Sequence, residues 1–332
     1  MKWRYISVLL LGFSLTTGCN QEDDIIPTEG TEKAFVLPQG DHDYDEDLVT
    51  YYKKYGFMPV YQFTTRDIYW NNTEWIGGDL HPVEGEGKLI VEEGDPEYVG
   101  KQWDLCKKVF LDAYPDNLLK QMPLKFYMCR KLGERKITKW LGDDEKGWGI
   151  WEYDTVQMMA CSGYDYIAAN LASPAIDTIS DETKLKFSKE LNALFMTYLQ
   201  KKKEGIFTAP EEFFKVHSYS PSYGTTQYIY NTQANQYGFV TGNFYLTKGK
   251  EEQAKQKDFA DYMLLITVPL EQLEKYVPAT YASSPMEGAL HPMRDTRGYI
   301  RKKYEILIKY MKEEVGINTD VWQYPLGKPN NQ

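Results

Sequence analysis

Residues 186–200, KFSKELNALFMTYLQ, contain the side chain of this sequence that is best suited to acid-base chemistry, Glu190. Apolar residues recur at helical spacing through the segment, which predicts a helix packed on a core. Glu190 lies at the edge of that apolar stripe, while Lys189 and Ala193 fall on roughly the opposite face. In a zinc hydrolase, a helix glutamate takes a proton from metal-bound water that two flanking histidines help to hold. The segment is therefore either such a helix without its histidines or an ordinary core helix.

No other motif in the chain indicates a catalytic centre. The four histidines all lie in loop-like contexts, at His42, His81, His217 and His291. Of these, His217 alone follows the candidate helix closely, and we interpret it as a polar loop residue in preference to a metal ligand. The sequence has no GxSxG motif and no phosphate-binding loop, and nothing favours a Ser/His/Asp triad.

Charge and cysteine content exclude several classes of function. The net charge is -10, whereas a nucleic-acid groove needs clustered lysine and arginine, so we expect no nucleic-acid partner. Beyond Cys19, the chain has Cys106, Cys129 and Cys161, an odd number without CxxC spacing. At most one disulfide can form among them, and their apolar neighbours favour buried thiols.

The N-terminus resembles a bacterial lipoprotein signal. Lys2 and Arg4 precede a short apolar run, and LTTGC ends it at Cys19. The run is too short to span a bilayer. LTTGC is similar to a lipobox, which implies removal of residues 1–18 and lipidation of Cys19. The acidic NQEDD that follows resembles the signal that sends Bacteroidetes lipoproteins to the outer face of the outer membrane, although an acidic linker is the alternative.

The rest of the chain indicates an α+β fold. Residues 20–45 lack periodicity and are rich in acid, Pro and Gly, so we predict a flexible tether at 19–45 and one domain at 46–325. Alternation and helical spacing predict strands first and helices afterwards. We expect strands within 57–64, 122–129, 147–159 and 164–171, and helices at 95–114, 180–203, 251–276 and 297–315.

Several ordered segments resemble the lipoprotein family of Bacteroidetes whose members are described as zinc-binding metallopeptidases, with a zincin-like fold. They are YYKKYGFMPVYQF, KELNA, IFTAPEEFFKVHSYSPSYG, GFV, KDFADYM and RGYIRKKYEILIKYMKEEVGI, between residues 48 and 322. The family carries H-E-F-A-H where this chain has KELNA, and an acidic segment on a second helix. The resemblance implies a zincin-like α+β domain with a mixed N-terminal sheet and a helical C-terminal lobe.

The differences from the family motif concern the metal. Lys189 stands at the first histidine and Ala193 at the second, so Glu190 would be a vestigial general base. On the second helix, Asp261 takes the place of the family's acidic residue, with Asp258 one turn before it. Lysine has no lone pair to donate and alanine has no donor atom, so two expected zinc ligands are missing. We expect Lys189 to pair with Asp258 or Asp261 in the place of the metal, and we expect no metal and no cofactor.

The preferred function is a catalytically inactive surface lipoprotein that helps a SusC/SusD-type importer to capture peptide or glycan. The tyrosine-rich tract HSYSPSYGTTQYIYNTQANQYGFVTGNFYLT is either exposed recognition surface or a tightly packed loop region. Two alternatives stay open. One is an active zinc metallopeptidase with an unconventional ligand set of Glu190, Asp258, Asp261 and His217, and the other is a purely structural importer subunit.

Overall fold

The structure is a computed structural model that describes residues 35–69, 89–143, 148–202 and 206–328. A compact unit begins at Pro38. Residues that the sequence placed in the tether already contact this unit, since the Gln39 side chain accepts hydrogen bonds from the backbone amides of Tyr61 (2.7 Å) and Gln62 (3.1 Å). His81 and Cys19 lie outside the described residues. Among the described helices, none has both the length and the apolar content that crossing a membrane requires.

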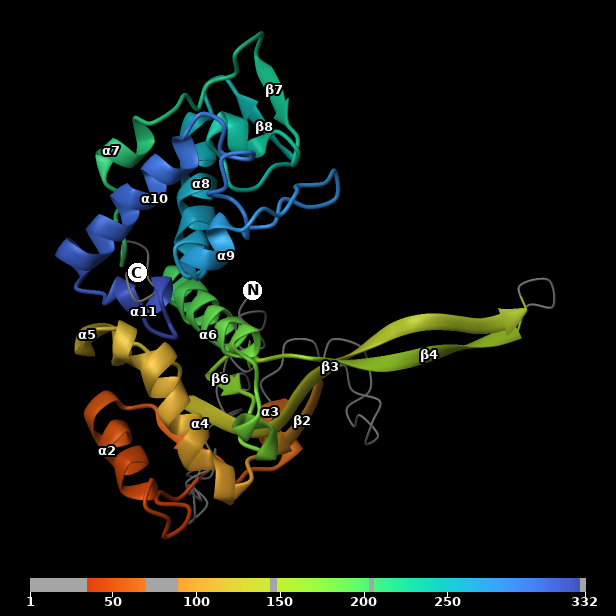
Figure 1. Cartoon of the computed structure of the whole chain (residues 1–332), viewed down its shortest axis with the longest axis vertical. Helices are drawn as coiled ribbons and strands as arrows, with labels where there is room; N and C mark the ends of the chain where they lie inside the picture. The colour runs from red at the N-terminus through yellow and green to blue at the C-terminus, as the bar shows by residue number, and fades with distance from the viewer. Residues whose placement is uncertain (1–34, 70–88, 144–147, 203–205, 329–332) are drawn as a thin grey trace, which may run out of the picture. The chain divides into compact units, whose positions relative to one another are not determined.

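The first half of the unit is built on a mixed sheet (Figure 1). Its strands are β1 Met58–Val60, β2 Leu89–Glu93, β3 Lys125–Asp143, β4 Trp148–Gln157, β5 Ala160–Ser162 and β6 Tyr166–Ala169. The order is β1-β3-β6-β5, in which β1 and β6 run parallel to β3 and β5 runs antiparallel to β6. Strands β2 and β4 pair antiparallel with the later part of β3.

Strand β3 is much longer than the sequence predicted. It continues past Cys129 and forms a hairpin with β4, in which Gly133 pairs with Gln157 and Asp143 with Trp148. Figure 1 shows this hairpin extending beyond the end of β2. Charged residues interrupt the hydrophobic alternation in this part of β3, which is why the pattern did not reveal it.

Helices precede, connect and follow these strands. They are α2 Asp45–Tyr55, α3 Thr65–Tyr69, α4 Pro96–Val109, the 3-10 turn η2 Leu111–Ala113, α5 Asp116–Leu119, the 3-10 turn η3 Pro174–Asp177 and α6 Asp181–Lys202. The Asp95 side chain caps α4 by accepting from the Glu97 amide (3.1 Å), and Pro96 fits the first turn because it has no N–H to leave unpaired. Helix α6 matches the expected 180–203 closely.

The C-terminal half is mainly helical and contains one small hairpin. Its elements are α7 Glu211–Phe214, β7 Thr226–Ile229, the 3-10 turn η4 Ala234–Tyr237, β8 Phe244–Thr247, α8 Glu251–Leu265, α9 Leu270–Glu274, α10 Tyr299–Tyr310, the π-helical η5 Met311–Val315 and α11 Thr319–Gln323. The single helix expected at 251–276 is two helices. Helix α8 ends at Leu265, and Pro269 is the N-cap of α9. Proline cannot donate the hydrogen bond that a continuing helix would need.

One large core unites both halves. Phe126 of β3, Trp103 of α4 and Phe195 of α6 share one buried cluster, and Trp322 of α11 joins it from the C-terminal half. Asn192 of α6 fixes this packing, since its side-chain oxygen accepts from the Trp322 indole N–H at 2.9 Å. The predicted α+β fold with a mixed sheet and helices is therefore confirmed.

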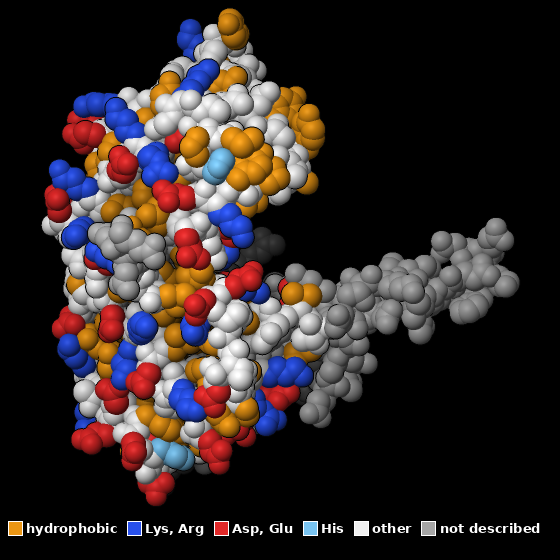
Figure 2. Space-filling view, in the orientation of Figure 1, with side chains coloured by type: hydrophobic (Ala, Val, Ile, Leu, Met, Phe, Trp, Pro, Cys, Tyr) orange, Lys and Arg blue, Asp and Glu red, His pale blue; other side chains and the backbone are white. Residues whose placement is uncertain are grey.

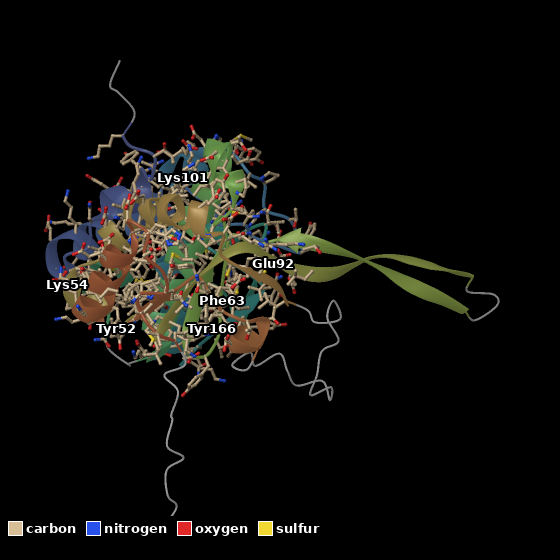
Figure 3. The ribbon with its side chains drawn as sticks, turned by 90° about the horizontal axis from the view of Figure 1, so that it is seen from below. Tyr52, Lys54, Phe63, Glu92, Lys101 and Tyr166 are labelled. Atoms are coloured by element: carbon tan, nitrogen blue, oxygen red, sulfur yellow. The ribbon has the colours of Figure 1, made fainter. Side chains whose placement is uncertain are left out.

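Aromatic rings also fill the opposite face of the sheet. Tyr127 follows Phe126 and so points to the other side of the strand. Its ring centroid lies 4.9 Å from that of Phe63 and 5.4 Å from that of Tyr166. Both partners are labelled in Figure 3, which shows them close together beside the sheet. Both faces of β3 are thus buried before the strand enters the hairpin.

A smaller core lies under the β7–β8 hairpin. Its buried members are Tyr219, Ile229, Ala234, Phe239, Leu246 and Ala254. Ile229 and Leu246 come from the two strands, and Ala254 comes from α8. The hairpin therefore has an inner face, packed on this smaller core, and an outer face.

Candidate functional site

Lys189 and Glu287 form an ion pair across two segments far apart in the chain. The Lys189 ammonium donates a short hydrogen bond to the Glu287 carboxylate, and both side chains are about a quarter to a third exposed. Burial acts to raise the pKa of Glu287, but the hydrogen bond and charge of Lys189, together with Arg294, outweigh it and hold the pKa below its ordinary value. The expected pairing of Lys189 with Asp258 or Asp261 is wrong, because each of those acids has another lysine.

Glu190 lies against the sheet. Its carboxylate accepts hydrogen bonds from the backbone amides of Met159 (2.9 Å) and Ala160 (3.1 Å), at the start of β5. Lys186, one turn earlier on α6, lies 3.8 Å away. The carboxylate that would serve as general base in a peptidase therefore holds the end of a strand to the helix.

Ala193 contributes no side-chain donor atom to the neighbourhood. It lies one turn after Lys189 on α6, and its backbone oxygen accepts a hydrogen bond from the Thr197 hydroxyl (2.8 Å). With lysine at one histidine position and alanine at the other, α6 offers no nitrogen or sulfur ligand there.

Asp258 is the centre of a buried polar cluster between α8 and α10. One of its carboxylate oxygens accepts short hydrogen bonds from the Lys303 ammonium and from the Tyr219 hydroxyl, the latter at 2.5 Å. The other oxygen, Oδ1, is buried and finds no hydrogen-bond partner among the described residues. Burial and the nearby carboxylate raise the pKa of Tyr219, which therefore stays protonated and able to donate.

Lys303 of α10 supplies the positive charge of this cluster. Its side chain is fully buried, and its ammonium also lies 3.0 Å from His217 Nε2 and 3.2 Å from the Gly238 carbonyl oxygen. Aromatic rings complete the enclosure, with the Phe213 and Tyr262 centroids 4.2 and 4.3 Å from the nitrogen. Burial lowers the pKa of Lys303 to about 8, although the Asp258 carboxylate acts in the opposite direction.

His217 belongs to the same cluster. Its Nδ1 lies 3.0 Å from the Ser218 carbonyl oxygen, to which it can donate, so Nε2 is left to accept from Lys303. The imidazole is 3.7 Å from Asp258 and its side chain is almost fully buried. His217 lies in a loop, as the sequence indicated, but its side chain is a buried partner of Lys303.

Asp261 has its own lysine one turn away on α8. Lys257 lies 2.6 Å from the Asp261 carboxylate, and the Thr241 hydroxyl donates a short hydrogen bond to the same oxygen. This pair is partly exposed, in contrast to the Asp258–Lys303 pair. Asp258 and Asp261 are therefore both neutralised by lysines of this chain.

Sequence reasoning missed Lys303, although the pattern contained a signal. In α10 the buried positions are Ile300, Lys303, Tyr304 and Leu307, the spacing of an apolar helix stripe. A lysine inside such a stripe has to be buried, and a buried ammonium requires an anionic or polar partner. The helix pattern could have identified the buried cation, but not Asp258 as its partner.

The described residues do not fit a catalytic zinc ion. Among them, no group of three His, Cys, Asp or Glu side chains is arranged to hold a metal. The other two histidines within the described ranges have different contacts, His42 with Asp45 at 3.2 Å and His291 with the Tyr276 ring at 5.1 Å between centroids. The thiols of Cys106, Cys129 and Cys161 are buried and do not form cystines.

The chain is similar in structure to a known protein. No family model and no curated protein matches this sequence. Among solved structures, the chain is similar to a crystal structure from Bacteroides caccae ATCC 43185 described as a "putative zinc-binding metallo-peptidase". The identity is 14%, the TM-score is 0.43, and the match covers 84% of this chain and 87% of that chain.

Proposed function

We propose that this protein is a zincin-like domain without peptidase activity that works as a binding protein. The proposal depends on the observation that lysine side chains lie beside the carboxylates of the site. Lys303 neutralises Asp258, Lys257 neutralises Asp261, and Lys189 neutralises Glu287. A divalent cation at any of these carboxylates would have to displace a lysine that is already hydrogen-bonded to it.

The cellular role follows from the N-terminus and the tyrosine-rich tract. We propose that Cys19 is lipidated and anchors the chain to the outer face of the outer membrane. There the domain would act as an accessory subunit of a SusC/SusD-type importer and would capture peptide or glycan. The lipobox-like LTTGC, the acidic NQEDD and the tyrosines exposed on the β7–β8 hairpin support this role.

Metal content and peptidase activity of the purified protein test the first part. We expect no stoichiometric zinc after dialysis against zinc-containing buffer, and no cleavage of a fluorogenic peptide library. Stoichiometric zinc with cleavage that a chelator abolishes would establish the alternative, an active zinc peptidase. A matched variant, Lys189→His with Ala193→His, should gain zinc affinity in a dye-competition assay, because it restores two imidazoles four residues apart on α6.

Anchoring is tested separately in intact cells. Mass spectrometry of the mature protein should find acyl chains on Cys19, and added protease should digest the protein without lysis of the cells. Replacing the acidic residues of NQEDD with alanine should leave lipidation unchanged and protect the chain from the protease. An unmodified Cys19 in a periplasmic protein would contradict the proposed location.

A further inference from the structure

The outer face of the β7–β8 hairpin carries a group of tyrosines, of which Tyr230 and Tyr245 are exposed. Tyr228 and Tyr245 are directly paired across the two strands, so their side chains lie on the same face. Tyr230 follows two residues after Tyr228, on that face by alternation. The inner face holds Ile229 and Leu246, which are buried in the smaller core. The aromatic rings therefore lie on the outer surface of a strand pair whose inner face is packed on the smaller core.

The rings support one another in a fixed arrangement. The Tyr228 ring lies edge to face with Tyr230, at 4.7 Å between centroids, and with Tyr245, at 4.8 Å. Tyr245 is 65% exposed and Tyr230 is 47% exposed. Figure 2 shows hydrophobic side chains gathered at the edge of the molecule where Figure 1 places this hairpin. Exposed aromatic surface that is already ordered loses little conformational entropy when it binds a ligand.

The backbone of a neighbouring loop is bonded to the end of this hairpin. The side-chain amides of Asn231 and Asn243 donate to the Tyr281 carbonyl oxygen at 3.2 and 3.4 Å. These bonds hold the loop at the end of the hairpin that adjoins Tyr230, and the Tyr281 side chain is 79% exposed. We call Tyr228, Tyr230 and Tyr245 the tyrosine platform.

The hairpin segment that carries Tyr228, Tyr230 and Tyr245 contains no charged residue. No Asp, Glu, Lys or Arg occurs between Lys215 and Lys248, although such residues make up 26% of the whole chain. The polar groups on the outer face are those of Thr226 and Thr247, which are paired across the strands beside the platform. Flat aromatic faces bordered by hydroxyls and amides suit a ligand with apolar C–H faces and many hydroxyl groups. Charged ligands would find no counter-charge in this segment.

We propose that the tyrosine platform binds a neutral oligosaccharide, whose sugar rings stack on the tyrosines and whose hydroxyls bond to the neighbouring polar groups. The inference rests on the proposed binding function and names its ligand class. A peptide is the alternative occupant. A peptide brings charged termini and side chains, for which this uncharged segment has no partner, so the observations favour the sugar.

Affinity electrophoresis of the full mature chain tests the proposal. The probes are dextran, laminarin, galactomannan and xylan as neutral glycans, polygalacturonate as an anionic glycan, and a tryptic digest of casein as competing peptide. We expect retardation by at least one neutral glycan and none by polygalacturonate. Tyr228→Ala with Tyr245→Ala should weaken that binding about tenfold or more, as loss of aromatic anchors does. Binding should change little between low and high salt, because no charges take part.

Matched variants separate loss of the platform from loss of folding. Tyr164 is 80% exposed in the turn between β5 and β6, so Tyr164→Ala should leave binding unchanged. Tyr245→Phe keeps the ring and should retain most of the affinity, and circular dichroism should be the same for all variants. No retardation by any neutral glycan, retardation that the tyrosine variants do not affect, or binding displaced by the casein digest would overturn the proposal. The metal content of the same preparation tests the proposed loss of the zinc site, and that result does not depend on whether a glycan binds.

Discussion

Replacing Lys303 with methionine should destabilise the protein far more than a typical lysine substitution. Methionine fills most of the space of the lysine stem but carries no charge. The variant leaves the Asp258 carboxylate fully buried with the Tyr219 hydroxyl as its donor, while Oδ1 already lacks a partner among the described residues. Breaking a buried ion pair in this way costs about 3 to 5 kcal/mol. For a chain of this size that loss corresponds to a decrease of about 4 to 8 °C in Tm.

A double-mutant cycle separates the charge pair from the packing of the lysine stem. Asp258→Asn removes the negative charge, and combined with Lys303→Met it leaves no unpaired charge in the cluster. We therefore expect the double variant to be less destabilised than the sum of the two single variants, with a coupling of about 3 kcal/mol. The measurement is urea denaturation at pH 7, followed by tryptophan fluorescence, with the slope m compared between variants to confirm the same transition.

Lys257→Met is the matched control on a neighbouring pair. Lys257 lies 2.6 Å from Asp261 on the same helix that carries Asp258, but this pair is partly exposed. A pair of that kind contributes about 0.5 to 1 kcal/mol. If Lys303→Met cost no more than Lys257→Met, or if the double variant were additive, the buried cluster would not be the charge compensation inferred here.

Two further predictions concern α6. Lys189→Met should lower the free energy of unfolding by about 1 kcal/mol at pH 7. The folded-state pKa of its partner Glu287 is lowered, so this contribution is present above the unfolded pKa of about 4.5 and disappears as the pH falls through the folded value. Urea denaturation repeated at successively lower pH should therefore show the difference between the variant and the original protein shrinking, and a loss that does not change with pH would argue against the ion pair. Glu190→Ala should cost about 1 to 3 kcal/mol, because it leaves the amides of Met159 and Ala160 without their acceptor. Hydrogen exchange should accelerate at both amides, and unchanged protection would show that Glu190 does not hold this strand.

Local pattern in the sequence determined the main elements. Apolar residues at helical spacing predicted a helix over 180–203, and the structure has α6 at Asp181–Lys202. The predicted strand within 164–171 contains β6, Tyr166–Ala169. The order of strands and helices gave the α+β class, and apolar neighbours indicated that Cys106, Cys129 and Cys161 are buried. These features depend on residues close together in the chain, and periodicity records such relations directly.

Only the tertiary structure decided which charges meet. The sequence indicated that Asp258, Asp261 and Lys189 belong to the altered site, but it paired them wrongly. Lys303 is 45 residues from Asp258, and Lys189 is 98 residues from Glu287. Each pairing depends on how elements distant in the chain cross and on which side chain faces inward at the crossing. Periodicity assigns a residue to a face of its own helix, whereas the packing of the helices determines what that face meets.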